Sequence, residues 1–466
     1  MTRWTWLRYA RTASAILSVA SAALLACGSK SARFIDNETT NGPTEARDDG
    51  GLFLGSGSPR ACENLECRRV TCDLPGTTTT LRGRVFDPSG RSPVYNAIVY
   101  VPNREPATIG AGVTCETCAG LALAPVAVAL TNENGEFVLK DVPVVDTLPL
   151  VIQVGKWRRK FAIPSIDRCA QNWIPDKTLT LPKNQAEGDM PRIALVTGAS
   201  DPMGCLLARA GVDASEFTSP SGKGRVHLFR GFGGENLADG TAPLAAEALW
   251  NTKENLAKYD LVMLSCEGDT YDENKPASAK SAMREYLNMG GRVFGSHYHY
   301  TWFENGPSDL ANVASWGPHG NTPNWIDNPR HEIDTSFPKG QAFGRWLKNV
   351  GASPDGNSIA LMDVKSDVRV ARGHTQRWIY RNEKDDEGPV KYISLNTPVD
   401  APVDKQCGRA VVTSLHISSG VANGRDSLPG SCRTSELLPQ EKALLFFFFD
   451  LSSCTQDDRV DPAPPR

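Results

Sequence analysis

Residues 290–300, GGRVFGSHYHY, decide how this chain folds. The segment before them, residues 277–289, has the periodicity of a helix, and two glycines interrupt it. Residues 292–294 then form a short apolar strand that runs into a polar loop. A helix, a glycine break, a buried strand and a polar loop are typical of a doubly wound α/β sheet, whose ligand crevice lies at the carboxyl ends of its strands. We therefore predict that residues 296–299 lie at the functional site.

The segments on either side repeat this alternation of strand and helix. Residues 192–197, RIALVT, form a continuous apolar run, which is typical of a strand buried on both faces of a parallel sheet. The pattern predicts further strands at 224–229, 259–264, 359–364, 378–381, 391–395 and 410–416, and helices at 203–210, 243–257 and 438–451. This order predicts a flavodoxin-like, doubly wound α/β domain over residues 191–455.

Residues 78–182 have a β pattern of short strands separated by turns, which predicts a β-sandwich. The segments LRGRVFDPSG (81–90), NAIVYV (96–101) and TNENGEFVLKDVP (131–143) resemble the carboxypeptidase regulatory-like domain. That resemblance implies a transthyretin-like sandwich, which in most members of the family is not catalytic. An insertion at 104–125 departs from the family pattern and carries Cys115 and Cys118. A polar stretch, 184–191, is expected to link the two domains.

The N-terminus predicts export and membrane anchoring. Three arginines precede an apolar run at 12–26, which ends in Leu24-Leu25-Ala26-Cys27-Gly28. This stretch resembles a bacterial lipobox, which implies a signal peptide over 1–26, lipidation of Cys27 with palmitate among its acyl chains, and an outer-membrane anchor, because Gly28 rather than Asp follows the cysteine. The alternative is an ordinary signal peptide that contains a cysteine. No later apolar run reaches the ~18 residues that a membrane span needs.

Charge and cysteine content narrow the function further. The chain has 50 Lys and Arg against 53 Asp and Glu, so a nucleic-acid partner has no electrostatic support. Its 12 cysteines are many for a reducing cytosol and natural for an exported protein. We expect most of them to form disulfide bonds, with the pairing left open, and no four-cysteine zinc site, because the required second close pair is missing.

The order of strand 259–264, helix 277–289 and the GGRVFGSH segment resembles the class I glutamine amidotransferase-like fold, and within it the trehalose-utilisation (ThuA-like) branch. In catalytic members of the fold a strand ends in Gly-x-Cys-x-Gly. Laid on residues 295–299, that pattern places His297 at the nucleophile and His299 at the second glycine. Imidazole is not the acyl acceptor of that chemistry, so amidotransferase activity is not expected.

The candidate catalytic residues are Cys266, Glu267, His297, His299 and His416. The first two close the strand next to the histidine loop, and a Cys266 thiolate with a histidine base would form a nucleophile. The alternative is a disulfide partner or an inert buried thiol. His416 follows an apolar strand and is expected at the same end of the sheet.

The same histidines define a candidate metal site. His297, His299 and His416 would bind a divalent ion together with a carboxylate. The carboxylates considered are Glu267, Asp269 and Glu304. The alternative is that the His-x-His pattern has no ligand role and that the protein has no cofactor.

Two further features suggest contact with saccharides. Aromatic residues that would stack on sugar rings, or else pack over the sheet, follow the site: Tyr298, Tyr300, Trp302, Phe303, Trp316 and Trp325. A basic segment, 156–160 (KWRRK), would contact anionic lipid or polysaccharide, or else form a solvated strand face.

Together these features predict a multidomain lipoprotein of the bacterial cell envelope, anchored to the outer membrane through Cys27. The expected parts are a signal peptide (1–26), a flexible tether (27–60), a cysteine-stapled β-sandwich (61–183), an α/β domain (191–455) and a disordered tail (456–466). We expect a non-catalytic binding or structural module for a carbohydrate or an envelope protein. The alternative is a hydrolase that uses the crevice around His297.

The lipid anchor is directly testable. Cells fed labelled palmitate should incorporate the label into the parent chain, and Cys27→Ala should abolish it, because Cys27 is the lipidated residue that the lipobox implies. Labelling in a Ser29→Ala control should be unchanged. Label retained by Cys27→Ala would contradict the prediction.

Overall fold

The computed structural model describes residues 62–118, 125–319, 330–381, 388–417, 427–428, 432 and 436–465. Cys27, the tether and Trp325 lie outside the described residues, so the predictions made for them remain predictions. Among the described residues, no helix is long and apolar enough to cross a membrane.

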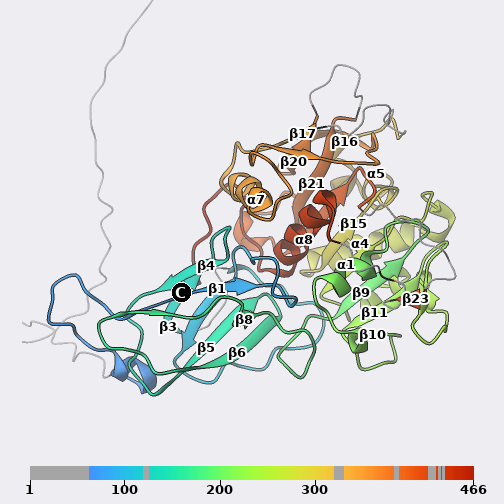
Figure 1. The fold of residues 1–466 in the computed structure, drawn as a ribbon. Coiled ribbons are helices and arrows are strands. Elements are labelled where there is room, and N and C mark those ends of the chain that lie inside the picture. Colours follow the sequence, from blue (N-terminus) through green and yellow to red (C-terminus); the bar gives the residue numbers. More distant parts are fainter. Residues whose placement is uncertain are drawn as a thin grey trace, which may run out of the picture. The chain divides into compact units, whose positions relative to one another are not determined.

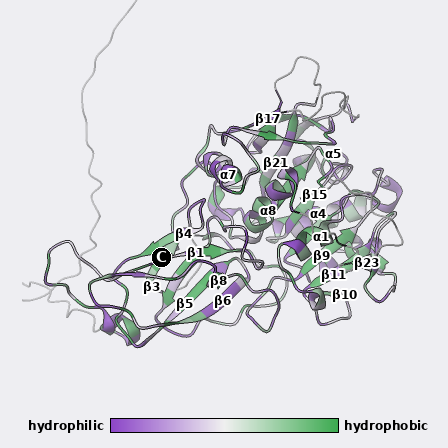
Figure 2. Ribbon diagram, viewed as in Figure 1, coloured by the Kyte–Doolittle hydropathy of each residue, from purple (hydrophilic) through white to green (hydrophobic). Residues whose placement is uncertain are grey.

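Two four-stranded sheets form the first region (Figure 1). One consists of β4 (Glu136–Leu139), β1 (Thr80–Phe86), β7 (Gln171–Trp173) and β8 (Leu179–Thr180), and the other of β3 (Pro125–Leu130), β2 (Ile98–Pro102), β5 (Thr147–Val154) and β6 (Trp157–Pro164). A short 3-10 helix, η1 (Asn64–Arg68), precedes them. Figure 2 shows the hydrophobic residues along β5 and the hydrophilic ones along β6.

Turn chemistry explains the strand pairing in this region. Strand β1 alternates, so that Leu81, Gly83 and Val85 face the core, and it pairs antiparallel with β4. The turn before β4 is closed by the Asn132 side chain, which accepts the Glu136 N–H at 2.9 Å, and by Gly135 with φ of +73°.

The second region is built on one large sheet, for which the described residues supply 13 strands. Its main path is β10 (Phe217–Thr218), β11 (Val226–Arg230), β9 (Ile193–Thr197), β14 (Leu261–Leu264), β15 (Arg292–Gly295), β22 (Gly408–Thr413), β21 (Val390–Thr397), β20 (Gln376–Tyr380), β17 (Arg330–Ile333) and β18 (Ser358–Ala360). Three strands pair off this path: β13 (Leu244–Ala245), β16 (Ala314–Trp316) and β19 (Val368–Ala371). A separate pair joins β12 (Asn236–Leu237) to β23 (Ser427–Leu428).

The direction of the strands divides this sheet into two parts. From β10 to β22 all neighbours are parallel, whereas β22, β21, β20, β17 and β18 pair antiparallel. The helices of the described residues are α1 (Met203–Arg209), α2 (Glu247–Trp250), α3 (Lys253–Leu256), α4 (Ala277–Asn288), α5 (Thr301–Glu304), α6 (Ser308–Ala311), α7 (Pro338–Asn349) and α8 (Pro439–Ser452). The prediction of a β-rich region followed by an α/β region is therefore confirmed.

One predicted element differs. The single helix expected at 243–257 is replaced by strand β13 and the short helices α2 and α3. The break occurs because Thr252 is extended and its side chain accepts the Asn255 N–H, which starts a new helix at that point.

The junction of α4 and β15 requires its two glycines. Gly290 has φ of +108°, which ends the helix, and a Cβ there would overlap the carbonyl oxygen of Thr114. A Cβ on Gly291 would lie 2.5 Å from the ring of Tyr286. The chain therefore turns tightly enough for β15 to enter the sheet between β14 and β22.

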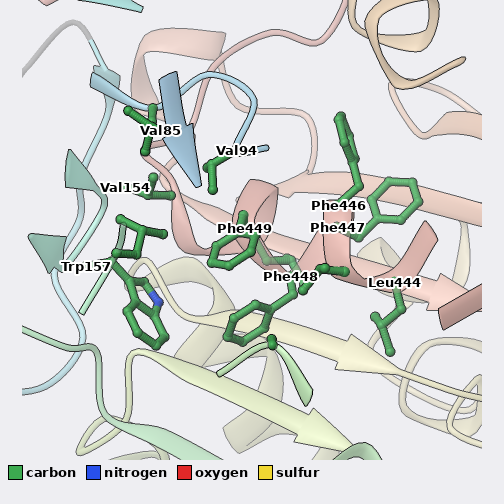
Figure 3. Packing of buried hydrophobic residues seen from close by; sticks show 14 of the residues in the cluster. Val85, Val94, Val154, Trp157, Leu444, Phe446, Phe447, Phe448 and Phe449 are labelled. Carbon is green, nitrogen blue, oxygen red and sulfur yellow. The ribbon is translucent and has the colours of Figure 1, made fainter. Parts of the chain in front are cut away.

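Helix α8 carries the core that both regions share. Its four consecutive phenylalanines, Phe446–Phe449, are all buried. Phe448 and Phe449 contact Trp157 of β6 edge to face, and Val85, Val94 and Val154 belong to the same hydrophobic cluster (Figure 3). This cluster continues into strands β9, β11 and β22, and residues 61–466 accordingly form one compact unit.

The basic segment 156–160 lies at this shared core. Trp157 is fully buried, Lys156 pairs with Asp260 at 2.6 Å, and Arg158 pairs with Asp189 at 2.8 Å. The expectation of a solvated or anion-binding strand face is therefore not met for these three residues, because all three are buried, and the α/β region contacts Lys156 and Trp157.

Disulfide bonds, which the cysteine content predicted, are confirmed. The pairs are Cys62–Cys67, Cys72–Cys169, Cys115–Cys407, Cys118–Cys454 and Cys205–Cys432. The third and fourth join the insertion in the β-rich region to the large sheet and to the end of α8. Among the described cysteines Cys266 is free, and it is buried.

The C-terminal segment differs from the expected disordered tail. Asp458 is buried, and it pairs with Lys339 at 2.6 Å and with Arg409 at 2.7 Å. Both cations also pair with Asp450 of α8. Burial of these charges in one network holds the segment after α8 against the sheet.

The shared core predicts a large effect on stability. Phe447 is fully buried among Phe343, Trp378 and Tyr392. We expect Phe447→Ala to lower the free energy of unfolding by about 3–5 kcal/mol, because it leaves a cavity in a packed interior. Denaturant unfolding measures this change. Phe232→Ala, at a phenylalanine that is 57% exposed, is the matched control and should change it by less than about 1 kcal/mol. Equal losses in the two variants would contradict the role of Phe447.

Candidate functional site

Four neighbouring parallel strands end at the candidate site. Strands β9, β14, β15 and β22 are adjacent in that order, so their carboxyl ends meet at one end of the sheet. The segments that follow these strands are 198–202, 265–269, 296–300 and 414–417. Three of the five predicted catalytic residues come together there: Cys266, His297 and His416.

His297 follows β15 and is oriented by an aspartate. Its Nδ1–H donates to Asp367 Oδ2 at 2.8 Å, and both residues are buried. Within the described residues, the Nε2 atom makes no hydrogen bond. Burial by itself would raise the pKa of Asp367, but the hydrogen bond from His297 and the nearby His319 ring hold that pKa below its ordinary value. An ionised aspartate therefore fixes the ring and leaves Nε2 for chemistry.

His416 follows β22 and faces His297. Its ring lies edge to face with that of His297, with centroids 5.3 Å apart. His416 Nδ1 lies 3.3 Å from Asp201 Oδ2, and the other Asp201 oxygen accepts the Ile417 N–H at 2.7 Å. Asp201 is fully buried. Two histidines, each with a buried aspartate, thus meet at the ends of neighbouring strands.

Cys266 lies next to the Asp201–His416 pair. One donor atom from each of Asp201, Cys266 and His416 lies within 4.8 Å of the other two. Ser200 donates its N–H to the Cys266 carbonyl at 2.9 Å, and Gly198 has no room for a Cβ against the same carbonyl. Burial raises the pKa of the Cys266 thiol, and Asp201 adds to this effect. In the protein as described, the sulfur is therefore a protonated thiol at neutral pH.

His299 and Glu267 do not join this cluster. His299 donates from Nε2 to the Ser265 carbonyl at 2.8 Å, and its Nδ1 accepts the Trp302 indole N–H at 3.2 Å. Both ring nitrogens are thus used inside the protein, and burial lowers the pKa of His299 to about 4. Glu267 pairs with the buried Lys275 at 2.6 Å. Neither is placed for the catalytic role that the sequence suggested, and His299 has no lone pair left for a metal.

Aromatic and ionisable groups surround the cluster. Tyr298 has φ of +70° on the turn after β15, and its ring lies 3.8 Å from that of His297. Tyr300 stacks on His319 at 4.0 Å, and His319 pairs with Glu304 at 2.8 Å. Burial alone would lower the pKa of His319, but the nearby carboxylates of Asp367 and Glu304 raise it. Trp302 and Phe303 are buried in the core instead.

Sequence reasoning missed three residues of this site: Asp201, His319 and Asp367. Asp201 follows the predicted strand 192–197 by four residues, so its place at a strand end could have been noticed. Asp367 and His319 come from segments that approach the site only through the antiparallel part of the sheet, where Gly317 donates its N–H to the Asp367 carbonyl at 2.9 Å. No local pattern indicates that contact.

The buried neutral state of His299 predicts a pH dependence. An unfolded histidine gains a proton below about pH 6.5, whereas folded His299 resists protonation down to about pH 4. Stability is therefore full above about pH 6.5 and falls as the pH drops from 6.5 toward 4. We expect His299→Gln to remove about 2 kcal/mol of the loss in unfolding free energy between pH 7 and pH 5.

Denaturant unfolding at the two pH values measures this difference. His374→Gln, at an exposed position, is the control and should keep the parent's pH dependence. An unchanged dependence in His299→Gln would show that His299 is not the neutral group.

Comparison with known proteins gives only weak similarities. No protein-family model and no curated protein matches this chain. A type II cohesin–X-dockerin complex from Acetivibrio cellulolyticus is 15% identical over 29% of this chain and 85% of its own, with a TM-score of 0.17. A β-galactosidase from Rahnella sp. R3 is 9% identical over 50% of this chain, which spans 30% of that protein, with a TM-score of 0.27. Such low scores identify neither the fold nor the function.

Proposed function

We propose that the protein is a hydrolase of the bacterial cell envelope, with His297 as general base. The observation that carries this proposal is the buried Asp367–His297 pair facing a second pair, Asp201–His416, at the carboxyl ends of adjacent parallel strands. Structural histidines have both nitrogens bound to protein, as His299 does. His297 differs, because among the described residues a hydrogen bond is found at Nδ1 alone.

The arrangement suits proton transfer. An aspartate on Nδ1 fixes the tautomer in which Nε2 carries the lone pair, and it stabilises the imidazolium that forms when Nε2 removes a proton from water. The charge change occurs in a largely buried setting, where the attraction between Asp367 and imidazolium is stronger than in water. His297 would therefore activate water, and His416 would contact the substrate or the attacking water.

Cys266 is not assigned as the nucleophile. A thiol attacks as thiolate, and burial among carboxylates raises the pKa of Cys266. Within the described residues, neither ring nitrogen of His297 forms a hydrogen bond to the sulfur. Water is the nucleophile that fits these groups, and hydrolysis is accordingly the reaction class.

The fold resemblance supports the location of the site. The order of parallel strands with a sharp turn after β15 is compatible with the class I glutamine amidotransferase-like fold and its ThuA-like branch. The residue of positive φ on this turn is Tyr298, one position after the aligned nucleophile. A histidine and a tyrosine at the turn fit hydrolysis by water better than amide transfer through cysteine.

The compartment follows from the N-terminus and the cysteines. The lipobox-like LLACG ending at residue 28 supports a lipid anchor on Cys27 in the outer membrane, with residues 27–60 as tether. The disulfide bonds support an oxidising envelope compartment. Substrate would then be a component of the envelope or of its surroundings, such as a polysaccharide or protein.

A second function, carbohydrate binding without catalysis, is favoured by one observation. Phe232, which is 57% exposed, packs against the ring of Tyr271 with centroids 4.4 Å apart. The Phe232 N–H also donates to Glu267 Oε1 at 3.0 Å, which places this pair beside the site. Exposed aromatic faces next to polar groups are suited to stacking on sugar rings.

A substrate panel tests the proposed hydrolase. The full chain, purified in detergent, would be assayed with nitrophenyl esters, nitrophenyl glycosides and amino-acid nitroanilides. We expect turnover of at least one class, and a fall in kcat of about 10²–10⁴-fold in His297→Ala and in Asp367→Asn, because general-base catalysis is lost.

His374→Ala is the control, since this histidine is exposed and outside the cluster. Activity that survives in His297→Ala would remove that residue as the base. If no substrate of the three classes is hydrolysed, and the protein binds a polysaccharide column in a way that Phe232→Ala abolishes, the binding function would replace the hydrolase proposal.

A further inference from the structure

We propose that Asp201, Cys266 and His416 form a binding site for one transition-metal ion, with zinc the best fit. The inference rests on the proposed function, because the ion would supply the activated water beside His297, but the binding itself can be tested without substrate. The ligand set differs from the three histidines that the sequence suggested. It takes one residue from each of three loops, after β9, β14 and β22.

The spacing of the donor atoms fits a small ion. Tetrahedral zinc with nitrogen and oxygen ligands at about 2.0–2.1 Å places these ligands about 3.3–3.4 Å apart. Asp201 Oδ2 and His416 Nδ1 are 3.3 Å apart, and all three donor atoms lie within 4.8 Å of one another. Sulfur ligands lie farther from zinc, at about 2.3 Å, so only a small approach of Cys266 completes the set.

The chemistry of the donors selects the metal. A thiolate, an imidazole and a carboxylate together suit zinc, whereas calcium and magnesium take oxygen ligands. Three protein ligands with a fourth position left for water are typical of catalytic rather than structural zinc. His299 cannot be the fourth ligand, because Trp302 donates to its lone pair.

Cys266 provides an independent indication. The ten other cysteines of the described residues are paired in disulfides. Among these residues, Cys266 is therefore the cysteine whose sulfur is free, and it lies at the proposed site. This sulfur is fully buried, and it lies within 4.8 Å of a carboxylate oxygen of Asp201 and a ring nitrogen of His416. A ligand role would account for a free sulfur beside these two donors at the end of β14.

The surroundings also orient the ligands. The Ile417 N–H bonds to Asp201 Oδ1 at 2.7 Å, which leaves Oδ2 facing His416. Gln440 donates to the His416 carbonyl at 2.8 Å, and Ser200 donates to that of Cys266 at 2.9 Å. Such outer contacts fix ligand positions in metal sites. They come from α8 and from the β9 loop, both anchored in the core.

Cobalt(II) substitution tests the site. The full chain in detergent would be treated with a chelator, without reductant so that the disulfides remain, and titrated with Zn²⁺ by calorimetry and with Co²⁺ by absorption spectroscopy. We expect one ion per chain and a thiolate-to-cobalt charge-transfer band. Cys266→Ser should abolish the band, and His416→Ala should weaken Zn²⁺ binding about 100-fold or more.

His297→Ala is the matched control, because it removes a neighbouring histidine that is not a ligand, and binding should stay within about tenfold of the parent. Circular dichroism shows whether each variant is folded. If Cys266→Ser does not fold, His416→Ala remains as a second variant, because the His416 side chain is partly exposed. Absence of the charge-transfer band in the folded parent, or binding unchanged in His416→Ala, would overturn the site.

The two proposals fail separately. Metal binding without hydrolysis of any substrate class would support the metal site and contradict the proposed hydrolase activity. Hydrolysis that depends on His297 but persists after chelation, in a protein that shows no cobalt band, would support the hydrolase proposal and contradict the metal site.

Discussion

The burial of helix α8 is the constraint on which the rest of the structure depends. Phe446 stacks on Tyr95 of the β-rich region, with centroids 5.6 Å apart, and Phe447 stacks on Tyr392 of β21 at 5.1 Å. A helix that is apolar on all sides must be covered on all sides. Both regions supply that cover, so the cluster around α8 is not buried by either region alone.

The same helix also fixes strand β22, which carries a site residue. At one end, Asp450 of α8 pairs with Arg409 at the start of β22 at 2.9 Å. At the other, Gln440 in the first turn of α8 holds the carbonyl of His416 just beyond the strand. Removing one member of such a buried charged network leaves the others unpaired and is strongly destabilising. The position of His416 is therefore tied to the core and not to a surface loop.

The sequence predicts what depends on local pattern. Apolar runs located β9, β14, β15 and β22, and residues that follow such strands, Cys266 and His297 among them, were rightly placed at one end of the sheet. The direction in which a side chain points is not determined by the local sequence pattern. His299 turns inward because Trp302, one helical turn on, offers a donor, and His297 is held by Asp367, which is 70 residues away along the chain. The break at Thr252 was missed because helix periodicity continues across it, while the cap depends on the extended backbone and the side-chain hydroxyl of Thr252.

The topology also explains how a reduced sulfur persists among disulfides. Cys407 lies at the amino end of β22, where the insertion supplies its partner Cys115, whereas Cys266 follows the carboxyl end of β14. In parallel strands the amino ends lie at one edge of the sheet and the carboxyl ends at the opposite edge. The six residues of β22 span about 20 Å between these two edges. A disulfide needs Cα atoms within about 7 Å, so the pairs that join the two regions cannot form with Cys266 without dismantling the sheet. The two disulfide bonds that join the regions, Cys115–Cys407 and Cys118–Cys454, thus leave the Cys266 thiol at the end of the sheet where the histidines meet.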